Sequence, residues 1–463
     1  MPRMGRVRAT DEAKRYGRRA SLLSIGVGIT GLITYLYFAI ASHELSRDEY
    51  GQVAVLWSAV FIVVSVLQRP VEQLLSRTVS ENITHEVPIG HTVRVAATIQ
   101  LAVAVGFDIV ALALRTPIQD HLLHGNSTLY WIGVASVTAY GASYFARGFL
   151  AGSHRLTIYA LLIISESISR TAFPFAVALG VASGQTAVAL GIVAAPTLSL
   201  IVVPFAFLRR FGGEREAAPE PAASTPSAPD TSEFTLARGG RFAAGVFLIM
   251  LSEQTFLNAG PLLVNATAGA AAAGYIFNVL MIARAPLQLF QAVSTSLLPH
   301  LTTLGSQGNE KDFRASVRVT ILAIAGFAAL VALAMLIAGP ELMQIAFGKS
   351  HSYDRADLVI ISVGMGLYLS AATLNQAALA KGQVRRASFC WIGCAVAFVA
   401  WMLIPIVEND FHRVEVGYLG AATLLCALLY RLYRQPVRPR EARVEPGSTE
   451  ELELQLASAD EAG

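Results

Sequence analysis

The sequence predicts an all-α membrane protein with about 12 transmembrane helices, in two six-helix bundles related by a pseudo-two-fold axis along the membrane normal. Three observations predict this class: the composition, a series of apolar runs, and the distribution of Lys and Arg between those runs. Of the 463 residues, 54% are hydrophobic and only 14% are charged. A soluble domain carries about 25% charged residues, so this chain has too few charges to cover a water-facing surface.

Twelve apolar runs are separated by polar, glycine or proline breaks. A helix of about 20 mostly apolar residues, with a rise of about 1.5 Å per residue, crosses the hydrocarbon core of a bilayer. Two of the longest runs contain the prolines Pro70 and Pro286, which predict a tilt or a kink. The runs are 20–41, 51–78, 94–114, 128–150, 157–180, 186–208, 240–263, 268–298, 317–338, 356–380, 387–406 and 414–432.

The positions of Lys and Arg predict the orientation, because loops on the cytoplasmic side carry an excess of both. With the N-terminus in the cytoplasm, the inner segments hold 27 of the 35 basic residues, with Arg147 at the end of the fourth run counted in the connection to the fifth, and the outer segments hold five. Three basic residues lie inside runs. The first run is long enough to span and has no small-residue cleavage site, so it is not a cleavable signal. We therefore expect a multi-pass protein of the cell (plasma) membrane with both termini cytoplasmic.

Polar segments divide the chain into five parts. Residues 211–238 are rich in Pro, Ala, Ser and Glu and cannot form a packed core, so they predict a disordered cytoplasmic linker. The expected parts are a basic N-terminal tail (1–19), an N-terminal six-helix bundle (20–210), the linker (211–238), a C-terminal six-helix bundle (239–433) and a disordered cytoplasmic tail (434–463).

The two bundles carry similar features in the same order, which indicates an internal repeat. Because each half has an even number of spans, both repeats run in the same direction and their axis lies along the membrane normal. The matched features are a glycine in a basic turn three residues before an arginine, an arginine just before a proline, and a glycine near the start of the second span. They are Gly152–Arg155 with Gly382–Arg385, Arg69–Pro70 with Arg284–Pro286, and Gly51 with Gly274.

Ionisable residues inside spans are the main candidates for function, since each costs about 2.5–3.5 kcal/mol at a helix centre on insertion scales. Glu166 and Arg170 are four residues apart, which predicts either an intrahelical ion pair or a cavity wall that meets a charged substrate. Arg284 has no acidic residue within a turn, so the cavity interpretation is favoured there. Arg69 either lines the cavity or extends to the inner interface. We expect Arg69, Arg170 and Arg284 to contact substrate.

A second set of residues suits ion coupling or sugar binding. Glu253 with its polar neighbours, Glu166 and Asp108 are candidate sites for a coupling cation or proton. The amides Asn278, Asn375 and Gln376 either bind sugar hydroxyls or join neighbouring helices.

Familiar catalytic and metal-binding patterns are absent from the sequence. It contains no phosphate-binding GxxxxGK[ST] loop, no HExxH, no GxSxG and no Cys/His metal spacing. The three cysteines, Cys390, Cys394 and Cys426, lie in apolar runs and have the character of packing residues. We expect no enzymatic activity, no nucleic-acid partner, no bound metal and no cofactor other than a coupling Na⁺ or H⁺.

Two segments resemble a known family. Residues 45–67 (LSRDEYGQVAVLWSAVFIVVSVL) resemble the element after the first helix of polysaccharide biosynthesis flippases, in the multidrug/oligosaccharidyl-lipid/polysaccharide exporter superfamily. Residues 286–304 (PLQLFQAVSTSLLPHLTTL) resemble the helix 8 element of the same proteins. The resemblance covers about residues 15–435. It implies two six-helix bundles around a central cavity, alternating access, and a polyprenyl-linked glycan as the substrate.

Three functions are weighed. The first is a flippase for a lipid-linked oligosaccharide or polysaccharide precursor, with Arg69 and Arg284 on the path of its phosphate. The second is a cation-coupled multidrug-type antiporter, because the expected mid-membrane set of Glu166, Glu253, Arg170 and Arg284 holds as many acids as bases. The third is a non-transporting membrane partner of polysaccharide assembly proteins. The expected partners are membrane lipid and the glycan substrate.

Overall fold

The computed structural model describes residues 26–85, 87–207, 236–282, 301, 310–348, 353–404 and 406–435, and these residues are almost entirely helical. Ten of the described helices are long and apolar enough to cross a membrane. The long helix α5 and the shorter apolar helix Ala270–Ile282 also fall within predicted runs. The described helices therefore account for all twelve runs, and the all-α membrane class is confirmed.

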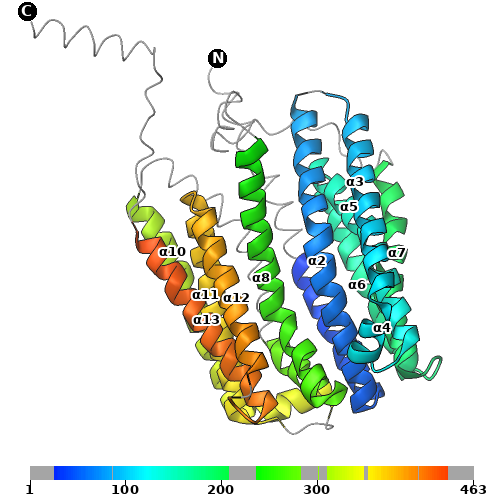
Figure 1. Ribbon diagram of the computed structural model, residues 1–463, viewed down its shortest axis with the longest axis vertical. Coiled ribbons are helices and arrows are strands. Elements are labelled where there is room, and N and C mark those ends of the chain that lie inside the picture. The colour runs from blue at the N-terminus through cyan, green and yellow to red at the C-terminus, as the bar shows by residue number, and fades with distance from the viewer. Residues whose placement is uncertain are drawn as a thin grey trace, which may run out of the picture. The chain divides into compact units, whose positions relative to one another are not determined.

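The first half contains a helix at Gly26–Glu44 followed by α2 and its successors. They are α2 (Arg47–Thr84), α3 (Gly90–Ala113), the short α4 (Arg115–Pro117) and η1 (Ile118–Leu122), α5 (Ser127–Gly152), α6 (Leu156–Ala178), α7 (Gly184–Ser199) and η2 (Leu200–Phe207). Helix α2 packs on α3, α5 and α7, and α6 packs on α7. Figure 1 shows these helices as neighbours.

The second half begins with α8 (Leu236–Ala268) and the helix Ala270–Ile282. It continues through α10 (Glu310–Phe347), α11 (Arg355–Ala380), α12 (Val384–Leu403) and α13 (Asp410–Arg434). Helix α8 packs on α12 in its own half and on α2 of the first half, so it joins the two halves (Figure 1). Helix α10 is kinked at Ala338, where φ is −132°, two residues before Pro340.

The helices alternate in direction, so their connections gather at two ends. We call the end with connections 84–90, 152–156 and 380–384 the basic end, and the end with connections 44–47, 178–184, 347–355 and 403–410 the acidic end. The sequence predicts that the basic end faces the cytoplasm. Helix α8 begins at Leu236, inside the predicted linker, and α13 ends at Arg434, the first residue of the predicted C-terminal tail. The rest of the linker, the tail beyond Gln435, the N-terminal tail, Arg284 and Pro286 lie outside the described residues, and the division into domains stays a prediction.

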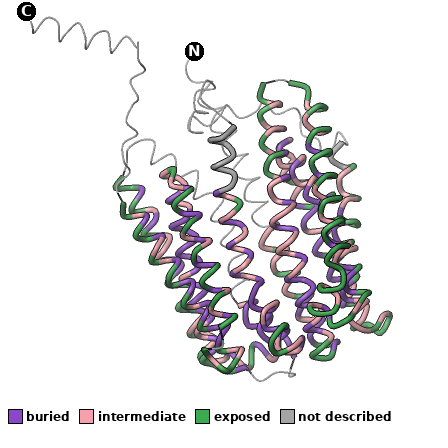
Figure 2. The backbone as a smooth tube through the Cα atoms, viewed as in Figure 1, coloured by how far each residue is buried: buried purple, intermediate pink, exposed green. Residues whose placement is uncertain are grey.

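The third span of each half has the most exposed apolar surface. Only 17% of the most apolar stretch of α3 and 11% of that of α10 is buried, against 72% for α11. Figure 2 shows α3 coloured largely as exposed. Leu101 in α3 and Leu330 in α10 are 65% and 64% exposed. Water disfavours such a surface and lipid does not, which agrees with the membrane class and with a repeat in which α3 and α10 correspond.

The turns after α5 and α11 share one hydrogen-bond pattern, and the pattern corrects the predicted alignment of the repeats. In the first turn, the backbone N–H of His154 donates to Ala151 O and that of Arg155 to Leu150 O. In the second, Gly382 N–H donates to Leu379 O and Gln383 N–H to Ala378 O. The residues with positive φ are His154 (58°) and Gly382 (71°). His154, and not Gly152, therefore corresponds to Gly382, since Gly152 is the last residue of α5.

Candidate functional site

A cavity of about 260 Å³ lies between the two halves of the described bundle. Its walls come from the helix Gly26–Glu44, α2, α5 and α6 of the first half, and from α8 and Met281 of the second. Four lining residues are charged: Arg69, Arg147, Glu166 and Arg170. Three arginines against one glutamate give this wall a formal charge of about +2. Glu72 and Glu253 interact with Arg69 from behind this lining, so the surroundings of the cavity keep the mixed charge that the sequence suggests while its lining is cationic.

Glu166 and two arginines form a buried network on the first-half wall. Arg170 Nη2 donates to Glu166 Oε1 at 3.0 Å, as the four-residue spacing predicts. Arg147 Nη2 donates to Glu166 Oε2 at 2.5 Å, and Ser143 Oγ donates to the same oxygen at 3.1 Å. The side chains of Arg170, Glu166 and Arg147 are only 3%, 5% and 11% exposed. Glu166 thus has its carboxylate fully engaged by protein donors.

Arg147 is the member of this network that sequence reasoning missed. The charge count assigns it to the connection after the fourth span, whereas the structure places it inside α5, facing α6. The assignment was wrong because Arg147 lies within one turn and a half of the helix end, so position along the chain does not separate a loop residue from a buried one. Its 19-residue separation from Glu166 gives no local spacing signal either.

Aromatic rings hold the two arginines in place. The guanidinium carbon of Arg170 lies 4.6 Å from the ring centre of Trp57, and that of Arg147 lies 4.5 Å from the ring centre of Tyr144. Cation–π contacts of this kind stabilise a cation by about 0.5–2 kcal/mol. Arg170 also donates to Tyr140 Oη at 3.0 Å. Among the described residues, the Nε atoms of Arg147 and Arg170 have no acceptor, so the network retains unused donors.

Arg69 lies on the same wall, one residue before Pro70 in α2. Within the described part of the chain it has no carboxylate oxygen within ion-pair distance. The carboxylate of Glu72, one turn further, accepts a hydrogen bond of 3.0 Å from Tyr159 Oη. Arg69 therefore makes no direct ion pair with a described residue. Glu72 and Glu253 nevertheless lie close enough to interact with it electrostatically, and its side chain hydrogen-bonds to Tyr144.

Of the other predicted site residues that the structure describes, none is among the lining residues of this cavity, although Glu253 interacts electrostatically with Arg69 on its wall. Asp108, half-buried in α3, accepts a hydrogen bond from Thr138 Oγ1 at 3.0 Å. Asn375 accepts from Trp391 Nε1 at 3.1 Å within the second half, and Gln376 follows it in α11. Glu253 is in α8 beside the lining residue Gln254. Arg284 lies outside the described residues.

Asn278 belongs to a seam that joins the two halves at the acidic end. Its side-chain oxygen accepts a hydrogen bond from Tyr50 Oη of the first half, and its Nδ2 donates to Tyr353 Oη at 3.1 Å. Burial raises the pKa of Tyr353 to about 12, so its hydroxyl stays neutral at physiological pH. Asn265 Nδ2 donates to Leu122 O at 2.9 Å across the same seam. The sequence predicts that Asn278 either binds sugar hydroxyls or joins neighbouring helices, and in this structure it joins helices.

Two glycines bring the halves into backbone contact at the seam. A Cβ on Gly51 would lie 1.8 Å from Ala270 O, and a Cβ on Gly274 would lie 3.1 Å from the Cα of Gly51. Gly51 therefore needs glycine, because any side chain there would separate the helices, and a side chain at Gly274 would force a smaller shift. The sequence matches these glycines as repeat equivalents, and the structure places them against each other, where a two-fold axis between the halves would pass.

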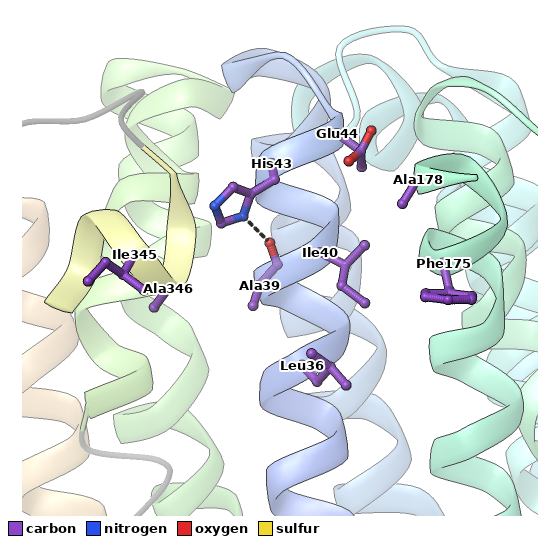
Figure 3. A pocket seen from close by; sticks show the side chains of 9 residues that line it. All are labelled: Leu36, Ala39, Ile40, His43, Glu44, Phe175, Ala178, Ile345 and Ala346. Carbon is purple, nitrogen blue, oxygen red and sulfur yellow. Dashed lines mark hydrogen bonds between the residues drawn. The ribbon is translucent and has the colours of Figure 1, made fainter. Parts of the chain in front are cut away.

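A second hollow of about 430 Å³ opens beside the seam. Figure 3 shows Phe175 of α6 on one side and Ile345 of α10 on the other, with the helix Gly26–Glu44 between them. Phe175 and Ile345 are 53% and 76% exposed. His43 is held by a 2.7 Å hydrogen bond to Ala39 O. This hollow is mainly apolar, in contrast to the cationic cavity.

Comparisons of the sequence with known proteins identify a family and several relatives. A family model described as "Polysaccharide biosynthesis protein" matches residues 16–304. Uncharacterized proteins of Mycobacterium bovis and Mycobacterium tuberculosis are 23% identical over 394 residues, which cover 82% of this chain and 84% of theirs.

Solved structures with a similar fold are MATE transporters. The Vibrio cholerae MATE transporter VcmN has a TM-score of 0.58 at 15% identity and covers 92% of this chain and 97% of its own. An inward-facing multidrug resistance MATE family transporter of the MOP superfamily has a TM-score of 0.62 at 11% identity, with coverage of 89% and 97%. The eukaryotic MATE transporter AtDTX14 has a TM-score of 0.61 at 12% identity, with coverage of 90% and 95%.

Fold and family together define the class. The all-helical architecture is that of the MOP-superfamily transporters, whose MATE members have twelve helices in two lobes. The chain belongs to the polysaccharide biosynthesis protein family, and it is a multi-pass membrane protein.

Proposed function

We propose that this protein flips a lipid-linked oligosaccharide or polysaccharide precursor across the cytoplasmic membrane by alternating access. The observation that carries the proposal is the cavity lining, which contains three arginines, Arg69, Arg147 and Arg170, and one acid, Glu166. A polyprenyl-linked glycan brings a phosphate or pyrophosphate through the cavity. Arginine matches phosphate oxygens with fixed charge and paired donors. A substrate that is an organic cation would be repelled by the same wall.

Some side chains on the wall hold the arginines in position, and others bind the substrate. Glu166 neutralises about one of its two arginine partners and fixes both in position, so the network keeps a positive charge without side-chain motion. Arg69 supplies the further cation for the phosphate. Gln254 and Asn258 on the facing helix α8 offer hydrogen-bonding groups that suit sugar hydroxyls.

The seam and the apolar hollow suit the rest of the cycle. In this conformation the seam joins the halves at the acidic end, so the substrate enters from the basic end, which the Lys and Arg distribution assigns to the cytoplasm. The polyprenyl tail stays in lipid against apolar surface such as the hollow beside Phe175 and Ile345. Opening of the seam, with closure at the basic end, then releases the head group outside.

The test is flipping in vesicles that hold only this protein. A fluorescent polyprenyl pyrophosphate oligosaccharide is placed in both leaflets, and a membrane-impermeant quencher measures the fraction that becomes accessible. Loss of a charge-assisted contact costs about 1.5–3 kcal/mol, so Arg69→Gln should slow flipping at least about tenfold. Arg77→Gln, in the same helix but with a side chain 66% exposed, is the control and should flip at the wild-type rate.

Other results would reject the proposal in favour of a named rival. Dye efflux driven by a Na⁺ or H⁺ gradient, without lipid flipping, would identify a cation-coupled antiporter. No flipping and no efflux by folded protein would identify a non-transporting partner of polysaccharide assembly proteins. Equal flipping by the Arg69 and Arg77 variants would remove Arg69 from the substrate path.

A further inference from the structure

Three metal-ligating side chains meet at the acidic end of the second half, outside the central cavity. They are Asp357 near the start of α11, and His412 and Glu415 near the start of α13. His412 and Glu415 are three residues apart and therefore share a helix face. One ligand atom from each of the three lies within 4.8 Å of the others.

Burial without a donor from outside the cluster distinguishes this group from an ordinary acidic surface. Glu415 is 0% exposed and Asp357 is 4% exposed. Among the described residues, no group outside the cluster donates a hydrogen bond to either carboxylate oxygen of Glu415 or to Asp357 Oδ1, whose neighbours are each other and His412. Two buried carboxylates beside a single imidazole are costly, so a bound cation would stabilise this group.

The adjacent arginine does not supply that charge. Arg413 Nη1 pairs with Asp410 Oδ1 at 2.9 Å, and Arg413 Nε donates to Val407 O at 2.9 Å. Both bonds hold the guanidinium at the start of α13. Glu415 is thus left facing Asp357 and the imidazole of His412.

The distance between His412 and Asp357 suits two ligands of a small tetrahedral cation, and the third ligand atom lies within 4.8 Å of both. His412 Nε2 lies 3.5 Å from Asp357 Oδ1, which is long for a hydrogen bond between these atoms. Zinc binds imidazole nitrogen and carboxylate oxygen at about 2.0–2.2 Å, so two tetrahedral ligands are about 3.3–3.6 Å apart. Two carboxylates and one imidazole leave the fourth position for water.

Capping side chains fix the starts of α11 and α13, so the three proposed ligands are held in position without the ion. Asp354 caps α11 by accepting from Ala356 N–H at 2.7 Å. Asn409 caps α13 by accepting from Phe411 N–H at 2.9 Å. His412 is 50% exposed on its side chain, which gives an ion access from the acidic end.

We propose that Asp357, His412 and Glu415 bind a divalent cation of the zinc class, which links α11 to α13 at the acidic end of the second half. A mixed nitrogen and oxygen ligand set favours zinc or a similar transition metal over Mg²⁺ and Ca²⁺. The proposal does not depend on the transported substrate, because none of the three residues lines the central cavity.

The test is metal binding to the purified full-length protein after removal of any histidine tag. Titration calorimetry with ZnCl₂ should show one site, and zinc should raise the melting temperature. Glu415→Gln and Asp357→Asn preserve side-chain shape and should each weaken zinc binding at least about tenfold. Glu408→Gln alters an exposed acid at the same end and should bind zinc as the wild type does.

His412→Ala is the site variant that should disturb folding least, because the side chain of His412 is half exposed. It should fold normally and lose most of the zinc affinity. Equal zinc binding by the wild type and all three site variants would overturn the proposal. So would stabilisation by Na⁺ or by acid alone, which would identify the pair Asp357 and Glu415 as a monovalent-cation or proton site.

Discussion

At the residue scale, the segment from Ser46 to Gly51 contains residues with separate structural roles. Ser46 and Glu49 form a capping box that starts α2: the Ser46 oxygen accepts from Glu49 N–H and the Glu49 carboxylate accepts from Ser46 N–H. Tyr50 reaches Asn278 across the seam, and Gly51 allows the backbone of Ala270 to approach. Each position therefore serves either the start of α2 or its contact with the second half.

Gly51→Ala should destabilise the seam. The added Cβ would meet Ala270 O at 1.8 Å, and forced repacking of this kind costs about 1–3 kcal/mol. We expect a melting temperature several degrees below wild type in detergent. Gly106→Ala, in α3 with nothing within 4 Å of the new Cβ, is the control and should be neutral or slightly stabilising. Equal melting of the two variants would refute a tight crossing at Gly51.

Glu166→Gln should destabilise the first half strongly. It removes the partner of two buried arginines, and breaking a buried ion pair costs about 3–5 kcal/mol. The control is Glu81→Gln, which breaks the exposed pair with Arg77 and should cost less than about 1 kcal/mol. Thermal melting of both proteins measures the difference. A Glu166 variant as stable as the control would show that its network does not contribute to folding.

At the element scale, the turns after α5 and α11 have one backbone form and two different residues at its left-handed position. A left-handed backbone costs a residue with a Cβ about 1–2 kcal/mol and costs glycine little. His154 carries this strain in the first turn, whereas Gly382 avoids it in the second. The hydrogen bonds match His154 with Gly382. The basic residues around the turns instead match Gly152 with Gly382, two residues away.

Reciprocal substitutions at these turns should have opposite effects on stability. His154→Gly should raise the free energy of unfolding by about 0.5–1 kcal/mol, and Gly382→Ala should lower it by about 1 kcal/mol. Gly90→Ala, at the start of α3 with open space around it, controls for the loss of a glycine. Melting curves of the purified variants give the comparison. Changes of the same sign would contradict the shared turn geometry.

At the scale of the whole molecule, the seam at the acidic end and the cationic cavity between the halves are parts of one arrangement. Helix α8 contacts α2 of the other half, and the hydrogen bonds of Tyr50 and Asn265 cross between the halves at the acidic end. Alternating access requires these contacts to break once per cycle. Because these contacts hold the two halves together at the acidic end, a covalent link across the seam should trap the conformation in which that end is closed.

A crosslink across the seam should stop transport. In a variant with Cys390, Cys394 and Cys426 replaced by alanine, Tyr50→Cys and Asn278→Cys place two thiols on opposite sides of the seam. A flexible, reducible bis-thiol reagent should abolish flipping in vesicles, and reduction should restore it. The matched control carries Tyr50→Cys alone and should keep flipping after the same treatment. Flipping that continues in the crosslinked protein would exclude opening at the acidic end.

The sequence by itself determined the class, the number of spans and the intrahelical pair of Glu166 and Arg170. These follow from composition, run length and a spacing of four residues, which are all local along the chain. It also matched Gly51 with Gly274, although it gave no indication that they touch.

Only the tertiary structure decided which charges meet. Arg147 joins Glu166 because α5 packs against α6, and Asp357 meets Glu415 because α11 lies beside α13. Neither pair has a sequence spacing that marks it, since helix packing brings together residues 19 and 58 positions apart. The balance of charge in the cavity, and with it the proposed preference for an anionic substrate, therefore depends on packing between helices and not on the pattern within any one of them.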